Sequence, residues 1–171
     1  MLLISDANVL IDMEVGGLMK WLFRLPMQFA LPDILYWEEI VPGTLELKDP
    51  GLRILEVTGE SIQYASALRG RYANAPGLND CLALALAKQE GCPLLTGDPD
   101  LKAVAQAERV PVKGSDWLLL TMVENELLNV DEAFAALASM KQGMRRLPWA
   151  DTERVLSGLR QSAGKPRTAA D

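Results

Sequence analysis

The chain opens with MLLISDANVLID, residues 1–12, in which a short apolar run ends abruptly at Asp6. Residues 2–5 have the pattern of a buried strand, and residues 8–12 that of a helical piece after it. The same order of apolar strand, acidic turn and helix returns in PLLTGDPDLKAVAQAE, residues 93–108, where Pro99 suits the first helical position. Strands that alternate with helices in this way predict a parallel sheet with helices on both faces.

The rest of the chain continues this alternation. Further strands are expected at 27–31, 53–57 and 110–112, the last at an edge because Pro111 cannot donate into a central ladder. Helices are expected at 17–25, 33–41, 61–71 (capped by Ser61), 80–90 (capped by Asn79), 116–127, 131–141 and 151–162. The helix over 80–90 contains CLALALA, which is apolar on every side. We therefore expect that helix at the centre of the fold.

Composition narrows the possible chemistry. The 171 residues are 49% hydrophobic, which suits one domain with a full core. The longest apolar run has seven residues and is too short to cross a bilayer, and Asp6 interrupts the only apolar stretch near the N-terminus. We expect a cytoplasmic protein without a membrane segment. There is no histidine, which excludes Ser-His-Asp, Cys-His and histidine-zinc sites, and Cys81 and Cys92 form no CxxC pair.

Charge is unevenly distributed. Residues 1–140 hold 20 acidic and 10 basic side chains, whereas residues 141–171 hold 3 acidic and 7 basic ones. The chain is therefore acidic over residues 1–140 and basic over residues 141–171, and it lacks the overall positive charge typical of nucleic-acid-binding proteins. Five basic side chains could contact phosphates, although a solvated surface position accounts better for each one taken singly: Arg69, Arg71, Lys102, Arg145 and Arg146.

Carboxylates remain as the candidate functional groups. Ligands of parallel sheets bind beyond the carboxyl ends of the strands, which points to Asp6 and to the turn TGDPD, residues 96–100. Asp6, Asp80 and Asp98 each suit an ordinary role at a turn or a helix start. Taken together, the three acids mark one rim of the sheet, where a hard metal ion such as Mg²⁺ or Mn²⁺ would bind.

A fourth carboxylate comes from the doublet Glu38-Glu39. On an α-helix, Glu38 shares an apolar stripe with Ile34 and Leu35, whereas Glu39 lies about 100° away and is expected in solvent. A glutamate that faces the core needs a partner, which a bound cation would supply. An error of one residue in the helix register would exchange the two glutamates, so Glu39 stays open as the alternative.

These segments resemble PIN-domain nucleases. The likeness is carried by SDANVLID (residues 5–12), by the helix from Pro32 to Glu38, by Asn79-Asp80 ahead of an Ala/Leu helix, and by LLTGDPDL (residues 94–101). It covers residues 2–125, and the helices after Gly114 resemble the subgroup with an extra helical C-terminus. The resemblance implies a three-layer αβα sandwich, with a nuclease domain over 1–128 and a helical extension with a frayed basic tail over 129–171.

The resemblance also implies a site and an activity. Asp6, Glu38, Asp80 and Asp98 would be catalytic and metal-binding, with Asp100 as an accessory ligand. Asn8 and Thr96 are expected to orient Asp6 and Asp98 through hydrogen bonds. The implied protein is a Mg²⁺- or Mn²⁺-dependent endoribonuclease and the toxin of a bacterial toxin–antitoxin pair, with RNA as substrate, an antitoxin as partner and a homodimeric state. The alternative is a catalytically silent PIN-like binding module.

Overall fold

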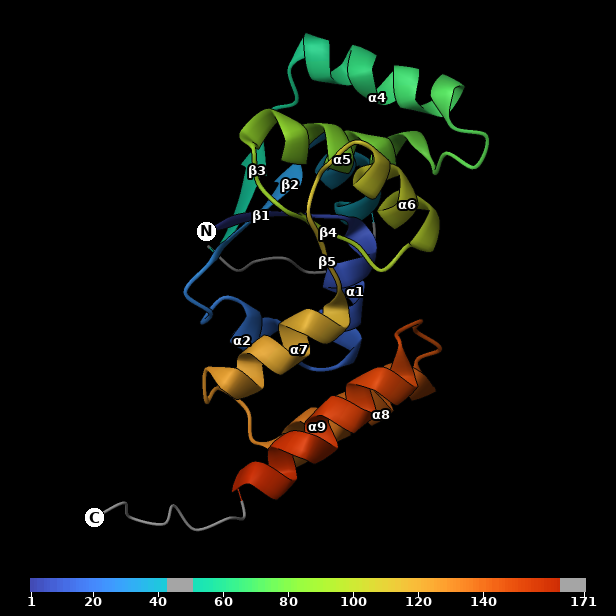
Figure 1. Cartoon of the computed structure of the whole chain (residues 1–171). Helices are drawn as coiled ribbons and strands as arrows, with labels where there is room; N and C mark the ends of the chain where they lie inside the picture. Colours follow the sequence, from blue (N-terminus) through green and yellow to red (C-terminus); the bar gives the residue numbers. More distant parts are fainter. Residues whose placement is uncertain (43–50, 164–171) are drawn as a thin grey trace, which may run out of the picture.

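A parallel sheet forms the centre of the molecule. The computed structural model describes residues 1–42 and 51–163, and within them five strands pair in the order β3-β2-β1-β4-β5 (Figure 1). Every pairing is parallel, and Ile4 of the central strand aligns with Ala30 on one side and Leu94 on the other. The strands are β1 (Leu2–Ser5), β2 (Gln28–Pro32), β3 (Leu52–Leu55), β4 (Leu94–Leu95) and β5 (Val112–Lys113). The predicted parallel sheet is confirmed, with β5 at an edge.

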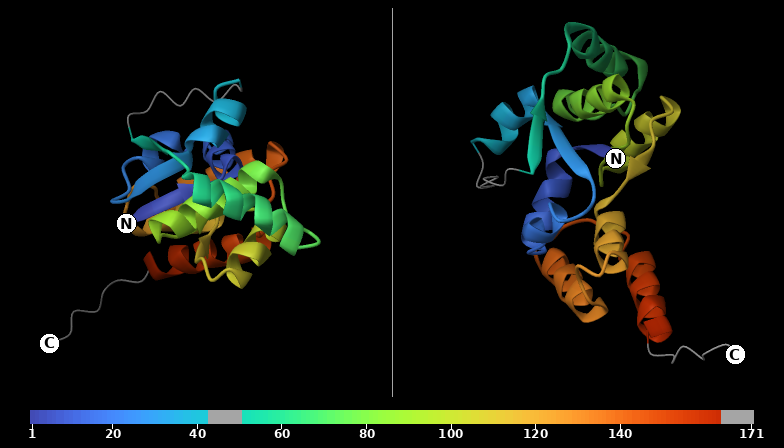
Figure 2. Two further views of the ribbon diagram at one scale, coloured as in Figure 1. Left: turned by 90° about the horizontal axis from the view of Figure 1, so that it is seen from above. Right: turned by 90° about the vertical axis from the view of Figure 1, so that its left-hand side faces the viewer.

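Helices cover both faces of this sheet. One face carries α5 (Leu78–Glu90) and α6 (Pro99–Ala107), and α4 (Gly59–Arg71) lies outside α5 (Figure 1). The other face carries α1 (Ala7–Val15), α2 (Met19–Leu22) and α7 (Ser115–Glu124). Beyond them lie α8 (Val130–Gln142) and α9 (Trp149–Ala163), the helices farthest from that face in the right-hand view of Figure 2. The arrangement is the expected αβα sandwich with C-terminal helices.

The central helix α5 is buried along most of its length. Each residue from Cys81 to Ala87 is buried, because the helix lies between the sheet and α4. This confirms the position expected from its all-apolar sequence. In α4 only Ala65 and Leu68 are buried, as suits an outer helix with one contact face.

Several helices differ in their bounds from those expected. Thr58, with extended backbone angles, caps α4 by accepting a hydrogen bond from the Ser61 amide, so Ser61 lies inside the helix. Helix α5 begins at Leu78 after Gly77, which places Asn79 in its first turn and frees the Asn79 side chain for other partners. The helix expected over 17–25 is limited to α2.

The helix that carries the glutamate doublet contains a π turn. After α3 (Asp33–Leu35), the chain continues as the π-helical segment η1 (Tyr36–Ile40), in which the Val41 amide donates to the Tyr36 carbonyl at 3.0 Å. An i→i+5 turn widens the helix and shifts the faces on which the following side chains lie. Trp37 is consequently 64% exposed and Glu38 is exposed, while Ile40 is buried. The expectation that Glu38 faces the core is therefore wrong.

The C-terminal helices are built into the core. Helix α8 packs against α1 and α7, and Met140 and Leu156 are fully buried. In α7 and the turn after it, Leu118, Leu119 and Leu128 are also buried. The division of the chain at residue 128 remains a prediction, and the frayed tail expected over 163–171 lies, apart from Ala163, outside the described residues. No helix in the described part of the chain is long and apolar enough to span a membrane.

A carboxylate at the end of α6 connects three helices. Glu108 accepts hydrogen bonds from the hydroxyls of Tyr64 (2.6 Å) and Tyr72 (2.8 Å), from Arg71 (2.6 Å) and from Lys88 (3.1 Å). These donors, Tyr64 foremost, lower the pKa of Glu108 to about 2. Because they come from α4, its C-cap and α5, the cluster fixes α4 against the layer beneath it.

We predict that Glu108→Gln lowers the free energy of unfolding by about 1–3 kcal/mol at pH 7, the range for hydrogen bonds to a charged group. A carboxyl group with a lowered pKa stabilises the fold above its unfolded pKa and loses that effect as the pH falls. The difference between wild type and variant should therefore shrink from about pH 4.5 towards pH 2. Urea unfolding measures it, with the exposed Glu14→Gln as control. Equal stability of Glu108→Gln and wild type at pH 7 would contradict this role.

Candidate active site

Two neighbouring strands present acidic residues at the same edge of the sheet. Asp6 directly follows β1, and its amide donates to the Leu95 carbonyl of β4 at 3.0 Å. Asp98 follows β4 after Thr96 and Gly97. Because β1 and β4 are parallel and adjacent, both carboxylates lie at one rim.

Asp6 is a fully buried carboxylate with one unpaired oxygen. Its Oδ1 caps α1 by accepting from the Val9 amide at 2.8 Å. Its Oδ2 is buried and has no hydrogen-bond partner among the described residues. Burial raises the pKa of Asp6 to about 7; the nearby Thr96 hydroxyl and the Val9 amide oppose this increase, and the charges of Asp80 and Asp12 add to it. Near neutral pH this group needs either a proton or a cation.

Asp80 and Asp98 complete the acidic rim. Asp98 caps α6, since its Oδ1 accepts from the Leu101 amide at 2.8 Å. Asp80 lies in the first turn of α5. Burial is the main cause that raises the pKa of Asp80, and the negative charges of Asp98 and Glu39 raise it further. The electrostatic coupling therefore joins Asp6, Asp80, Asp98 and Glu39 in one negatively charged group.

The glutamate doublet is held by a single amide. Asn79 donates through Nδ2 to Glu39 Oε1 at 2.7 Å and to Glu38 Oε2 at 3.1 Å. Both glutamates are exposed. Only Glu39 is among the charges that raise the pKa of Asp80. The structure thus brings Glu39 into the electrostatic group and leaves Glu38 at its margin, the reverse of the order expected from an α-helical stripe.

The other expected site residues have different positions. The Thr96 hydroxyl accepts a hydrogen bond from the Asp98 amide at 3.0 Å, as expected for a residue that positions Asp98. Asn8 has no hydrogen bond to Asp6 within the described part of the chain; its carbonyl and side-chain oxygens accept from Arg145 at 3.4 and 3.3 Å. Asp100 is exposed and lines a separate pocket with Tyr72 and Asn74, outside the electrostatic group.

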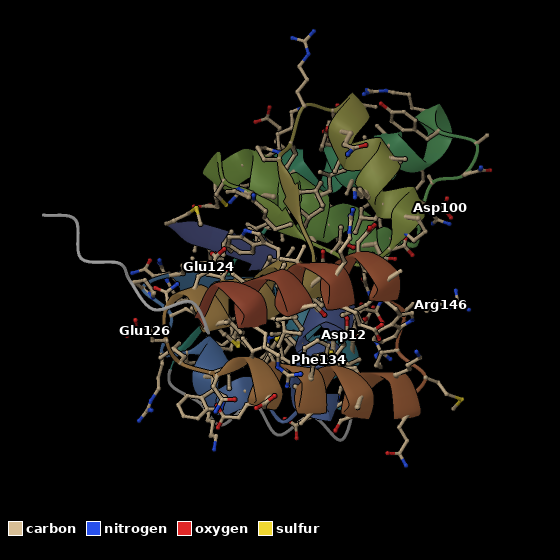
Figure 3. All side chains as sticks on the ribbon, turned by 60° about the horizontal axis from the view of Figure 1, so that its bottom comes forward. Asp12, Asp100, Glu124, Glu126, Phe134 and Arg146 are labelled. Carbon is tan, nitrogen blue, oxygen red and sulfur yellow. The ribbon has the colours of Figure 1, made fainter. Side chains whose placement is uncertain are left out.

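A second buried carboxylate was not singled out as a site residue from the sequence. Asp12 on α1 accepts hydrogen bonds from the Ser115 hydroxyl and from Arg145 Nε, both at 2.5 Å. Asp12 is buried, and in the view of Figure 3 it is labelled between the ribbons of α8 and α9. Arg145 lies 133 residues away in the chain, so no local pattern could have revealed the pair. The ion pair between Arg145 and Asp12 holds the loop between α8 and α9 against α1, next to the acidic rim.

The rim suits a hard cation in its donor type and charge. Carboxylate oxygens are the donors that Mg²⁺ and Mn²⁺ prefer, and the unpaired Asp6 Oδ2 is a buried oxygen without a compensating group. Within residues 1–42 and 51–163, no three His, Cys, Asp or Glu side chains are grouped closely enough to hold an ion together. Thiolate ligation has little support, because Cys81 and Cys92 are buried and burial raises the pKa of both thiols.

Comparison with known proteins agrees with this arrangement. A family model described as a PIN domain (DUF3368) matches residues 2–161. The chain belongs to the PIN-domain family. The match includes the acidic rim of this PIN domain and extends through α8 into α9.

One solved structure shares the PIN fold of this chain. It is the crystal structure of VapBC2 from Rickettsia felis bound to a DNA fragment from their promoter, with a TM-score of 0.50. The aligned region is 16% identical and covers 67% of this chain and 98% of that chain. At this identity the likeness shows the fold alone. A search of curated proteins found no match.

We predict that the metal-free protein loses stability as the pH rises. Asp6 binds more protons in the native state than in the unfolded state between about pH 4 and pH 7, so the free energy of unfolding should fall across this interval. The expected decrease is roughly 2–4 kcal/mol. Chemical unfolding in EDTA from pH 5 to pH 8 measures the part of this decrease that lies above general acid unfolding.

The variant Asp6→Asn keeps the cap on α1 but carries no charge, so it should flatten this pH dependence and be more stable than wild type at pH 8. The exposed Asp151→Asn serves as control and should follow wild type. Saturating Mg²⁺ should weaken the dependence in the wild type. The prediction is contradicted if the free energy of unfolding of the wild type does not change with pH and Asp6→Asn is less stable than wild type at pH 8. Burial of the Asp6 carboxylate would then cost no stability.

Proposed function

We propose that this chain is a Mg²⁺- or Mn²⁺-dependent endoribonuclease that hydrolyses RNA phosphodiester bonds at the acidic rim. PIN domains are a family of nucleases, which supports the reaction class. The observation that carries the proposal is the buried, unpaired Oδ2 of Asp6, placed beside Asp80 and Asp98 at the edge of a parallel sheet. A protein that used this site only for structure would pair such an oxygen.

The residues proposed to hold the cation are Asp6, Asp80, Asp98 and Glu39, with Glu38 as the alternative. When bound, the ion would lower the pKa of a coordinated water and neutralise charge on the phosphate. The protein contributes fixed positions: the Val9 amide orients Asp6, and the Leu101 amide orients Asp98. The chain has no histidine, so the proton of the attacking water would pass to solvent or to a carboxylate of the rim. We assign it to the Asp80 oxygen that does not face the cation, because Asp80 lies in the first turn of α5 beside Asp98 and Glu39.

The alternative is a catalytically silent PIN-like binding module. The absence of a preformed group of three ligands in the described residues favours this alternative. The presence of an acidic residue at each expected position supports the nuclease. Metal binding separates the two proposals, since a silent module has no reason to bind a hard divalent cation at this rim.

A role in a toxin–antitoxin pair extends the proposal. A solved structure with the same fold is a VapBC2 assembly bound to promoter DNA. By analogy, we propose that this chain is a cytoplasmic toxin, that a cognate antitoxin protein binds it, and that it forms a homodimer. A small open reading frame directly upstream in the genome, encoding an acidic or amphipathic protein, would support this proposal.

We predict cleavage of single-stranded RNA in Mn²⁺ or Mg²⁺ and none in EDTA. Asp80→Asn should lower the rate roughly 10²–10⁴-fold, the range for loss of a general base. Either ion should also raise the melting temperature of the wild type, since binding to the native state stabilises it. The control variant Asp151→Asn should behave like wild type. If no RNA is cleaved and neither ion changes the melting temperature, the silent module is the correct description.

The glutamate doublet gives a separate prediction. We expect Glu39→Gln to reduce cleavage more than Glu38→Gln, because only the Glu39 charge acts on Asp80. The two variants are matched, since both residues are exposed and both accept a hydrogen bond from Asn79. Single-turnover cleavage rates at saturating Mn²⁺ test the order. A larger loss in Glu38→Gln would assign the ligand to position 38.

A further inference from the structure

Two adjoining pockets lead away from the acidic rim. The first, about 240 Å³, is lined by Asp98, Asn8 and Arg145 among others. The second, about 490 Å³, lies between α6, β5 and the loop after α8. Gly97, Pro99 and Arg146 line both pockets. The two pockets thus form a continuous surface from Asp98 towards the C-terminal helices.

The second pocket gathers positive charge on an acidic protein. It is lined by Lys102 of α6, by Lys113 of β5 and by Arg146. None of the three forms an ion pair with an acidic residue in the described part of the chain. Asp116 is the single acidic residue lining this pocket among those described. The chain carries a net charge of −6, so this local excess of positive charge stands out beside a rim of carboxylates.

An aromatic ring completes the pocket. Trp117, half-buried at the start of α7, lines it, and the Lys113 ammonium lies 5.0 Å from the ring centroid. Cations that follow a phosphate backbone, combined with an aromatic side chain on which a base can stack, are typical of sites for single-stranded nucleic acid.

Two consecutive arginines in the loop after α8, Arg145 and Arg146, have different surroundings. Arg145 turns inward to the buried Asp12 and to Asn8, which fixes the loop. Arg146 is exposed and has no such partner, and Figure 3 shows it at the surface on the same side as Asp100. The loop therefore holds the backbone of Arg146 along the pocket that Asp98 also lines, where the exposed guanidinium can contact a phosphate.

We propose that Arg146, Lys102, Lys113 and Trp117 form a binding site for the single-stranded RNA that flanks the scissile phosphodiester. This inference rests on the proposed ribonuclease function and adds the path of the substrate. A continuous strand would place one phosphate at the carboxylates, with their cation, and neighbouring phosphates at the three basic side chains. A single-stranded nucleic acid is favoured over an acidic peptide, because Trp117 offers a ring on which a base can stack and the pocket is continuous with the one that Asp98 lines.

The test is the binding of a short fluorescent phosphorothioate oligouridine, which is hydrolysed slowly, in Mg²⁺ at several salt concentrations. The double variant Arg146→Glu/Lys102→Glu should bind at least about tenfold more weakly. The log–log slope of its affinity against salt should be shallower by about 0.7 for each phosphate that no longer meets a basic side chain. Arg146→Lys should keep most of the affinity. Arg53→Glu, an exposed arginine on β3 at the opposite edge of the sheet, is the matched control and should bind like wild type.

The outcomes separate this inference from the proposed function. If wild type cleaves RNA but the double variant and Arg53→Glu bind the oligonucleotide equally well, the binding site is wrong and the ribonuclease stands. If binding depends on Arg146 and Lys102 but no RNA is cleaved, the binding site stands and the catalytic proposal fails. If the wild type binds polyglutamate through Arg146 and does not bind the oligonucleotide, the pocket is a protein-binding site and the inference is overturned.

Discussion

The fully buried carboxylate of Asp6, at the end of the central strand, is the constraint around which the rest of the site is arranged. Strand β1 lies between β2 and β4, and Asp6 at its end is fully buried, so a charge placed there is shielded from solvent. One oxygen is used as the cap of α1, and the other has no partner among the described residues. A domain of this size has a net stability of about 5–15 kcal/mol, so an uncompensated buried charge consumes a substantial part of it. Its presence points to function.

Helix α1 shows the contrast directly, because it carries two buried acids, one at its cap and one within it. Asp12 has both oxygens satisfied, one by Ser115 and the other by Arg145. The second oxygen of Asp6 has no hydrogen-bond partner among the residues described, although the Thr96 hydroxyl lies near the carboxylate and lowers its pKa. The C-terminal extension thus neutralises one of the two carboxylates, and through the neighbouring Arg146 it brings a second guanidinium to the same edge. In this loop Arg145 stabilises the fold, and the adjacent Arg146 is the residue proposed to contact the substrate.

The parts of the fold that depend on local pattern could be predicted from the sequence. The apolar runs before Asp6 and Asp98 are strands, the all-apolar helix is central, and Pro111 marks an edge. Features that depend on distant contacts or unusual backbone geometry could not be predicted. The π turn at Tyr36–Ile40 exchanged the surroundings of the two glutamates, since the stripe argument assumes α-helical spacing. The pairing of Asp12 with Arg145 joins residues at opposite ends of the chain and leaves no local signal.

The most direct test of the account is the titration of the Asp6 carboxyl group by carbon-detected NMR, with selective labelling and Asp6→Asn for assignment. In EDTA the carboxyl should titrate near pH 7. In saturating Mg²⁺ its midpoint should fall below the ordinary aspartate value of about 3.9, because a bound cation favours the charged form. A midpoint near 3.9 under both conditions would contradict the account: Asp6 would then be an ordinary helix cap with no need of a cation.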